Sequence, residues 1–227
     1  MNIKIIGTSH IAKQSVQEIK KAILEEKPEL IAVELDIQRA TALLQEEKRK
    51  VPLREILQIG IKGYAFARVG QYVQQKLGKM VGVAPGSDMK AALEVAHKEK
   101  IKVALIDQPI KITLQNLSKN LTWKEKGRFL TDIVKGIIQP KKQLLELGME
   151  AFDLRKVPAE EVIEKMMDHL KQRYPSLHKT IVEDRNKYMV KKIVKIIRNN
   201  PEQKVLVVVG AGHKKGMEEL LLKVDII

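Results

Sequence analysis

The sequence contains no cysteine, and only 4% of its 227 residues are aromatic. Without cysteine the chain has no disulfide bonds and no thiolate ligands for a metal. With so few aromatic residues, the core is expected to consist of isoleucine, leucine, valine and methionine, in a chain whose hydrophobic content is 44%. This length suits one domain, and we expect residues 1–227 to form a single one.

The sequence also lacks a signal peptide and any apolar run of membrane-spanning length. Its first residues lead directly into a strand-like segment, without the charged and then apolar regions of a secretory signal. No stretch stays apolar and uncharged for the roughly 18 residues that are needed to cross a bilayer. These features favour a cytoplasmic protein.

Charge is abundant and mostly positive, with a formal net charge of +14. Nucleic acid or an anionic membrane surface is the usual partner of such an excess. The lysines are, however, spread along the whole chain and interleaved with glutamate, and no known nucleic-acid-binding motif occurs. We therefore expect no nucleic-acid partner, and interpret the charge as a solvated Lys/Glu-rich surface of the kind found in thermophile proteins.

Four short apolar runs have the pattern of buried strands. They read NIKIIGTSH, ELIAVELD, KVALIDQP and KVLVVVGAGH. Segments with helical spacing lie between them, as at residues 15–26 and 37–48. A strand, a helix and a strand in succession form a βαβ unit, so the first two strands should be parallel. The sequence therefore predicts an α/β fold with a mostly parallel central sheet and helices around it.

Two further regions are helical in pattern. Residues 114–177 contain too much helix for one crossover connection, and we interpret them as a large helical insertion. Residues 53–80 are apolar with interspersed glycine and basic residues. They fit a helical hairpin docked on the core, a cap over a site, or a surface in peripheral contact with a membrane. We favour the docked hairpin.

Polar side chains follow all four predicted strands, at the points where ligands bind in open parallel sheets. These residues are His10, Glu34 and Asp36, Asp107, and His213. Glu34 continues the row of Leu30 and Ala32, so its carboxylate lies on a buried face and needs a cationic partner. Simpler interpretations exist for two of the others. Asp36 could cap the helix that follows it, and Asp107 could form a turn before Pro109. The other three histidines, His97, His169 and His178, lie on polar helical stretches and are expected to be exposed.

One arginine lies in an otherwise apolar helical stripe. Arg185 falls between Val182 and Met189 on the face of the helix that is expected to be buried. A buried guanidinium should pair with acidic groups, and we expect Glu34, Asp36 or Asp107 to be those partners. Glu183 borders the same face. The pair Arg185 and Glu183 could thus reach the pocket that holds Glu34, or form a structural salt bridge between helix and sheet.

The segments IIGTSHIAKQSVQEI, PELIAVELDIQR, LIDQPIKITL, VEDRNKYM and VVVGAGHKKGM together resemble the TraB/PrgY family. That family is related to GumN proteins and to the Tiki metalloproteases, and its wider group has an erythromycin-esterase/ChaN-like α/β fold. The resemblance covers most of the chain in order. Its hallmark is a pair of Gly-x-x-His motifs, which here are Gly7 to His10 and Gly210 to His213.

The resemblance implies a hydrolase with both motif histidines and an acidic residue at its site. Tiki proteins are described as proteases that depend on manganese or cobalt, whereas the PrgY branch is linked to degrading or sequestering a peptide pheromone. Many prokaryotic relatives continue into a membrane-spanning C-terminal region, so this chain would be membrane-associated if such a region followed it. The residues carried over are Gly7, His10, Glu34, Arg185 with its acidic neighbours, Gly210 and His213.

These expectations combine into one candidate site. Gly7 and Gly210 would let the chain turn sharply at neighbouring strand ends, so that each histidine projects into the same crevice. His10, His213 and Glu34 would then form a three-ligand site for Mn²⁺, Co²⁺ or Zn²⁺, with Glu34, Arg185 and Glu183 as the catalytic candidates. The supporting positions would be Gly7, Asp36, Asp107, Gly210 and Gly212.

Three functions remain open on the sequence alone. The first is a metal-dependent hydrolase, most simply a peptidase. The second is a metal-free hydrolase in which a histidine acts as the general base, with Glu34 and Arg185 orienting it. The third is a peptide-binding or sequestering protein without turnover. A peptide partner is expected in each case, and a homo-oligomer is compatible with all three.

Overall fold

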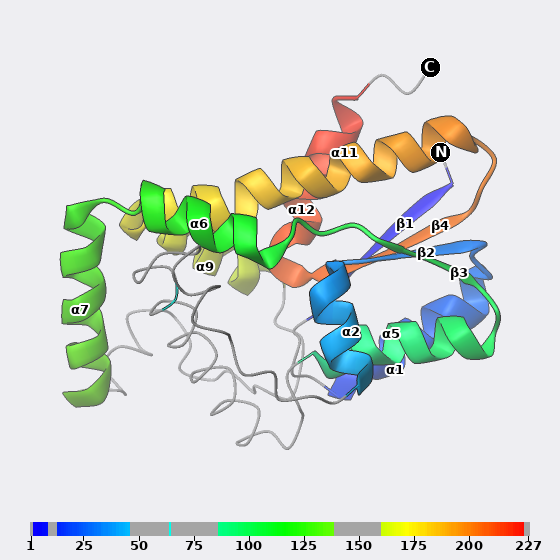
Figure 1. Cartoon of the computed structure of the whole chain (residues 1–227), viewed down its shortest axis with the longest axis horizontal. Helices are drawn as coiled ribbons and strands as arrows, with labels where there is room; N and C mark the ends of the chain where they lie inside the picture. Colours follow the sequence, from blue (N-terminus) through cyan, green and yellow to red (C-terminus); the bar gives the residue numbers. More distant parts are fainter. Residues whose placement is uncertain (1, 9–12, 46–63, 65–85, 139–159, 225–227) are drawn as a thin grey trace.

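A computed structural model of the chain describes residues 2–8, 13–45, 64, 86–138 and 160–224. Within these residues four strands form one parallel sheet in the order β1-β4-β2-β3 (Figure 1). The predicted α/β fold with a parallel sheet is confirmed. Of the predicted hairpin at 53–80, only Tyr64 falls within the described part of the chain. The strands are β1 (Ile3–Thr8), β2 (Leu30–Val33), β3 (Lys102–Leu105) and β4 (Val205–Gly210).

The last strand in the sequence, β4, occupies a central position in the sheet. It pairs with β1 from Ile3 opposite Val205 to Thr8 opposite Gly210, and with β2 on its other side. All residues of β4 are buried, as its uninterrupted apolar sequence predicts for a central parallel strand. The first two strands are therefore parallel, as expected, but β4 separates them.

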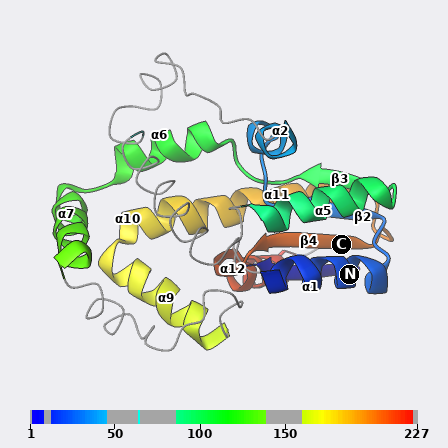
Figure 2. The same cartoon turned by 90° about the horizontal axis from the view of Figure 1, so that it is seen from below.

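Helices cover both faces of the sheet, which gives three layers (Figures 1 and 2). One layer contains α1 (Lys13–Glu26), α2 (Ile37–Gln45) and α5 (Ser87–Lys98), and the other contains α11 (Asp184–Asn199) and α12 (Ala211–Leu222). Side chains alternate between the two cores: Ile31 and Val33 pack with α1 and α5, whereas Ala32 packs with α11 and α12. Glu34, the next even-numbered position, therefore points toward α11.

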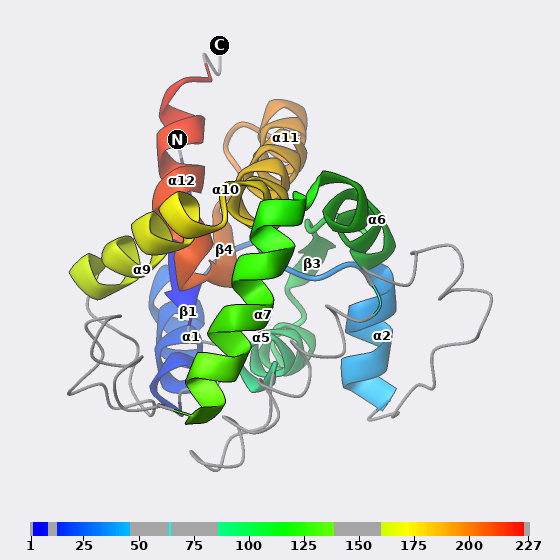
Figure 3. The ribbon, with the colours of Figure 1, turned by 90° about the vertical axis from the view of Figure 1, so that its left-hand side faces the viewer.

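The described parts of the predicted insertion are mostly helical. Its helices are α6 (Ile110–Asn120), α7 (Trp123–Ile138), α9 (Glu160–Arg173) and α10 (Pro175–His178). They extend from the end of the sheet at which α12 begins, and α7 lies farthest from the strands (Figures 1 and 3). A π-helical turn, Lys179–Glu183, joins α10 directly to α11.

Polar contacts hold α7 against the end of α9. Glu125 accepts the backbone N–H groups of Thr122 and Ser176 at 2.9 and 2.7 Å, so it caps α7 and fixes the start of α10. Farther along α7, the hydrogen bond and charge of Arg173 lower the pKa of Asp132. Burial and a hydrogen bond to the same carboxylate raise the pKa of Tyr174 to about 12.

The last helix begins without an intervening loop. The sequence predicts it from Lys215, yet α12 starts at Ala211, directly after β4, and this places His213 in its first turn. Gly210 has φ −60° and ψ 142°, a conformation that any residue can adopt. The expectation that this glycine enables a sharp turn is therefore wrong. Gly7 is needed for a different reason, because a Cβ there would lie 3.0 Å from the Ala211 Cα.

We predict that Gly7→Ala lowers the free energy of unfolding by about 1–3 kcal/mol, because the added methyl group meets backbone that cannot move aside easily. Gly127→Ala is the matched control, since a Cβ at Gly127 has no neighbour within 4 Å. There the greater helix propensity of alanine should stabilise the protein by about 0.5–1 kcal/mol. Urea denaturation measures both changes, and effects of equal sign would contradict the close packing of β1 against α12.

Candidate functional site

Polar residues from four elements meet at the carboxyl ends of the strands. Glu34 and Asp107 follow β2 and β3, His213 lies at the start of α12, and Arg185 lies in the first turn of α11. Arg185 is hydrogen-bonded to each of the other three side chains. We call these four residues, with Asn186, the strand-end cluster. In Figure 1 it falls where the start of α12 meets the end of β2.

Arg185 is the centre of this cluster. Its Nε donates to Asp107 Oδ1 at 3.0 Å, and its Nη2 donates to Asp107 Oδ2 at 2.7 Å and to Glu34 Oε1. Its Nη1 donates to the Ile181 carbonyl at 3.1 Å and contacts His213 Nε2 at 2.9 Å. A guanidinium has five N–H groups, so these contacts use every donor that Arg185 has.

The charge on Arg185 is matched by buried carboxylates. Burial alone would lower the pKa of the guanidinium, but the attraction of Glu34 and the hydrogen bonds and charge of Asp107 outweigh it, so the pKa is raised. Glu34 is 4% exposed, and its second oxygen accepts the Gly210 backbone N–H at 2.6 Å. The predicted pairing of Arg185 with strand-end acids is confirmed.

The hydrogen bonds of His213 define its tautomer. An arginine can only donate, so Nε2, which contacts Arg185 Nη1, is the acceptor and carries no proton. Nδ1 therefore carries the proton and donates to Asn186 Oδ1 at 2.6 Å. The imidazole is thus neutral and oriented from both sides. Its Nε2 also lies 3.4 Å from Glu34 Oε1.

A second arginine, Arg39, binds the outer side of the acids. Its Nε donates to Asp36 Oδ2 at 3.1 Å, and its Nη2 donates to Asp107 Oδ2 and to the Glu34 carbonyl. Asp36 caps α2 by accepting the Arg39 backbone N–H at 3.0 Å, and it also accepts the Ile110 N–H. The interpretation of Asp36 as a helix cap is confirmed, and Asp107 bridges the two guanidinium groups.

Glu183, a catalytic candidate from the sequence, has other partners. It is 38% exposed, and its Oε1 lies 3.3 Å from His178 Nδ1 and 4.0 Å from Lys171 Nζ. The expectation that His178 is exposed is wrong, because it is 8% exposed. The interpretation of Glu183 as bordering the buried face assumed 3.6 residues per turn. The π-helical turn at residues 179–183 changes that spacing, so side chains on its two sides do not share the counted face.

The two motifs of the Gly-x-x-His pair differ in what the structure describes. The strands that carry them, β1 and β4, are neighbours, as predicted. His10 lies outside the described residues. Thr8, two positions earlier, donates its hydroxyl to Asp88 and, at 3.3 Å, to the Val209 carbonyl. Gly212 packs against Met167, because a Cβ atom added at Gly212 would lie 3.1 Å from the Met167 sulfur.

Comparison with known proteins identifies the family of this chain. A profile described as the TraB/PrgY/gumN family matches residues 2–224. The chain belongs to this family. An uncharacterized protein of Methanocaldococcus jannaschii is 34% identical over 227 residues, which are 99% of this chain and 54% of that protein. TraB domain-containing proteins of Mus musculus and Homo sapiens are each 24% identical over 245 residues, covering 96% of this chain and 62% of theirs. The chain thus spans only part of the length of these relatives.

Sequence reasoning missed Arg39 and Asn186, which bind members of the cluster, and Asp88, which binds Thr8 at the end of β1. Asn186 had a usable signal, because it lies four residues after Val182 and three before Met189 on the buried stripe. Asp88 is completely buried at the start of α5, beside the end of β1. Nothing in its local sequence distinguishes it from an ordinary residue in the first turn of a helix.

Two of the implied metal ligands, Glu34 and His213, are bonded to Arg185 in this arrangement. Glu34 Oε1 and His213 Nε2 are 3.4 Å apart, a suitable separation for two ligands of one ion. Both atoms, however, are bonded to the Arg185 cation. Within the described ranges, no three histidine, aspartate or glutamate residues form a group that could hold a metal ion. A metal on Glu34 and His213 would require Arg185 to move away.

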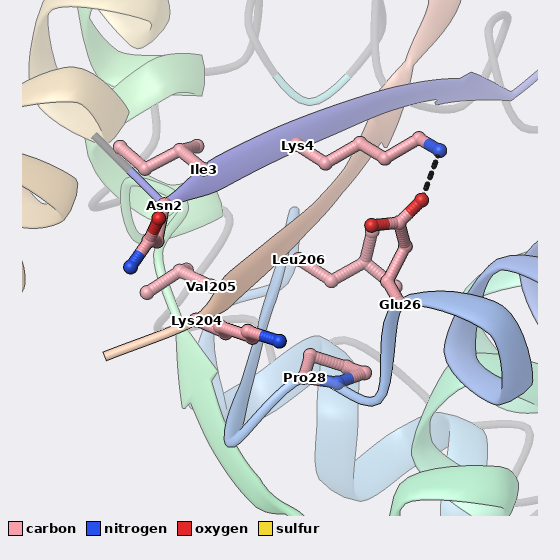
Figure 4. A pocket seen from close by; sticks show the side chains of 8 residues that line it. All are labelled: Asn2, Ile3, Lys4, Glu26, Pro28, Lys204, Val205 and Leu206. Carbon is pink, nitrogen blue, oxygen red and sulfur yellow. Dashed lines mark hydrogen bonds and ion pairs between the residues drawn. The ribbon is translucent and has the colours of Figure 1, made fainter. Parts of the chain in front are cut away.

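A separate cleft lies at the opposite end of the sheet. Figure 4 shows its lining, in which Lys4 of β1 reaches toward Glu26, the last residue of α1. Its walls come from the amino ends of β1 and β4, so it is remote from the strand-end cluster.

Among the helices that the structure describes, none has the length and apolar character to cross a bilayer.

We predict that Arg185→Ala lowers the free energy of unfolding by about 3–5 kcal/mol, because it leaves Glu34 and Asp107 buried without their shared cation. Arg198→Ala, at the exposed end of the same helix, is the control and should change it by about 0.5 kcal/mol or less. Urea denaturation gives both values. Equal small effects would show that the buried carboxylates do not depend on Arg185.

Gly216 packs closely against Asn186, because a Cβ atom added at Gly216 would lie 2.5 Å from Asn186 Nδ2. Gly216→Ala should displace the Asn186 amide and thereby disturb the Nδ1–H hydrogen bond of His213. Nitrogen NMR of the His213 ring measures the tautomer and the hydrogen bond directly. Gly127→Ala is the control for a glycine replaced within a helix and should leave those signals unchanged. An unaltered His213 spectrum in Gly216→Ala would contradict this support role.

Proposed function

We propose that this TraB-family chain is a hydrolase of carbonyl substrates, in the first place peptides, with His213 as its general base. The observation that carries the proposal is the neutral His213 held between Asn186 and Arg185. A general base needs an unprotonated nitrogen of fixed orientation within reach of the reacting water. Nε2 meets this description at the strand ends, where ligands bind in parallel sheets.

Arg185 supports this role because its Nη1 N–H can exchange partners. When a substrate carbonyl oxygen accepts that N–H in place of His213, Nε2 becomes free to accept a hydrogen bond from water. His213 then takes a proton from the water as the water oxygen attacks the carbonyl carbon. The guanidinium opposes the negative charge that develops on the carbonyl oxygen.

Glu34 and Asn186 stabilise the protonated histidine that this step creates. Glu34 Oε1 is 3.4 Å from His213 Nε2, close enough to favour an imidazolium. Asn186 keeps Nδ1–H directed away from the reaction. The imidazolium then gives its proton to the leaving nitrogen or oxygen as the carbon–heteroatom bond breaks. All protons are therefore accounted for by water, His213 and the leaving group.

The two other functions expected from the sequence lead to different experimental results. A bound Mn²⁺, Co²⁺ or Zn²⁺ would activate water and polarise the carbonyl. The 3.4 Å spacing of Glu34 Oε1 and His213 Nε2 favours that alternative, whereas the bonds of Arg185 to both atoms oppose it. A peptide-sequestering protein would use the same strand-end cluster without turnover.

We predict that protein purified without a histidine tag cleaves members of a mixed peptide library or of a chromogenic ester series. Mass spectrometry detects cleavage of the peptides, and absorbance detects cleavage of the esters. His213→Ala should reduce kcat/KM by about 10²–10⁴-fold through loss of the general base. His169→Ala is the matched control, because His169 is exposed on α9. This variant should be as active as the wild type.

Exhaustive chelation separates the three functions. Activity that survives chelation supports the histidine-base hydrolase. Activity that returns only with added Mn²⁺ or Co²⁺ would establish the metal-dependent alternative. Tight peptide binding without cleavage in either state would establish the sequestering protein, and both of these results would refute the proposed mechanism.

A further inference from the structure

A groove with an apolar floor and a basic rim runs between α11 and α12, which lie side by side on one face of the sheet (Figure 3). Its volume is about 530 Å³, within the range of ligand-binding pockets. We infer that this groove binds an amphipathic helix of a partner protein, with acidic residues one turn apart beside its apolar face. The inference is independent of the proposed hydrolase, because none of the described lining residues belongs to the strand-end cluster.

The floor of the groove belongs to the hydrophobic core that α11 and α12 form with the sheet. Val190 is buried there, and three further apolar lining residues are only partly buried: Val194, Leu220 and Val224. From Lys187 to Asn199 the lining follows α11 for about 18 Å, or roughly three helical turns. An apolar stripe of about that length would remove the floor from water, and such burial is favourable.

One edge of the groove is a row of exposed cations on α11. Lys187, Lys191 and Lys195 recur at every fourth residue, and Arg198 continues the row. None of the described residues that line the groove is acidic. The sequence has no acidic residue at all from position 185 to 201, so the interleaving of lysine and glutamate seen elsewhere in the chain is absent from this helix.

The three lysines of this row have no counter-charge in the described part of the chain. Lys192, on a different side of the same helix, is engaged: it donates to the Leu105 carbonyl at 3.0 Å and lies 5.1 Å from the centre of the Tyr188 ring. Like charges four residues apart destabilise a helix by about 0.2–0.5 kcal/mol per pair. A partner with acidic side chains would turn this repulsion into attraction.

The spacing of the cations favours a helix as the occupant. Cations four residues apart are separated by about 6 Å along the axis, and carboxylates at the same spacing on a second helix can face them. A single lipid has one headgroup and would leave most of the row unmatched, and a flat bilayer would not reach the recessed Val190. A symmetric second copy would place the same basic row against this one. Helices with an apolar face commonly bind in hydrophobic grooves.

The test measures fluorescence anisotropy of a labelled peptide of about 18 residues, long enough to form a helix. The peptide carries leucine along one stripe and glutamate at every fourth position beside it. A peptide of the same composition with these positions shuffled is the control. We expect saturable binding of the first peptide to the wild type, and binding about tenfold weaker or less for the shuffled one. Added NaCl should weaken the binding, because salt screens exposed charges.

Charge reversal on the protein tests the basic row directly. Lys191→Glu/Lys195→Glu should weaken binding by about 5–30-fold, because two attractions become repulsions. Lys20→Glu/Lys98→Glu is the matched control, since it changes the net charge equally at exposed positions on α1 and α5. This control should bind as the wild type does. A peptide with lysine in place of glutamate should bind Lys191→Glu/Lys195→Glu better than it binds the wild type. Circular dichroism verifies that both variants are folded.

His213→Ala separates this groove from the proposed catalytic site, because it should bind the glutamate peptide as tightly as the wild type. Several results would overturn the inference. They are absence of peptide binding, binding that Lys191→Glu/Lys195→Glu leaves intact, and an equal loss in Lys20→Glu/Lys98→Glu. Binding to phosphatidylglycerol vesicles without binding to the peptide would indicate a membrane surface instead. Self-association that Lys191→Glu/Lys195→Glu abolishes in sedimentation would indicate a second copy. None of these results depends on hydrolysis.

Discussion

The five-donor contact of Arg185 is the interaction on which the strand-end cluster depends. Three buried groups from separate elements, Glu34, Asp107 and His213, share this one guanidinium. Two carboxylates removed from water at the edge of a sheet are costly unless a cation compensates them. Arg185 provides that charge, and its planar geometry lets it contact all three groups at once.

The helices must pack closely for this arrangement to form. Gly7 allows β1 to approach the first residue of α12, and Gly216 allows α12 to approach Asn186. These contacts set the position of His213, whose orientation follows from Asn186 on one side and Arg185 on the other. Gly7 and Gly216 therefore act through the absence of a side chain rather than through unusual backbone angles.

The match to the TraB/PrgY/gumN family covers residues 2–224, so it includes every element that contributes to the cluster. The chain corresponds to about half to two thirds of the length of the relatives it matches, so larger proteins contain a unit of this kind. The acids, the arginine and the histidine have a clear structural role together. In the proposed mechanism, their chemical role rests on how readily Arg185 exchanges its partners.

The sequence by itself determined the parallel α/β fold and the need of Arg185 for acidic partners at the strand ends, because both follow from local patterns. Apolar runs identify the four strands. A charged side chain in the apolar stripe of a helix needs a buried counter-charge. The acidic residues at the strand ends were the candidates for that counter-charge.

Only the tertiary structure decided which side chains share Arg185, and it excluded Glu183 from that group. The π-helical turn before α11 alters the helical spacing, so Glu183 contacts His178 and Lys171 instead. Arg39 and Asp88 became recognisable only through partners that are distant in the sequence. The sequence indicates which polar groups reach the sheet edge, but their hydrogen bonds depend on distances of a few tenths of an ångström, which close packing of the helices sets.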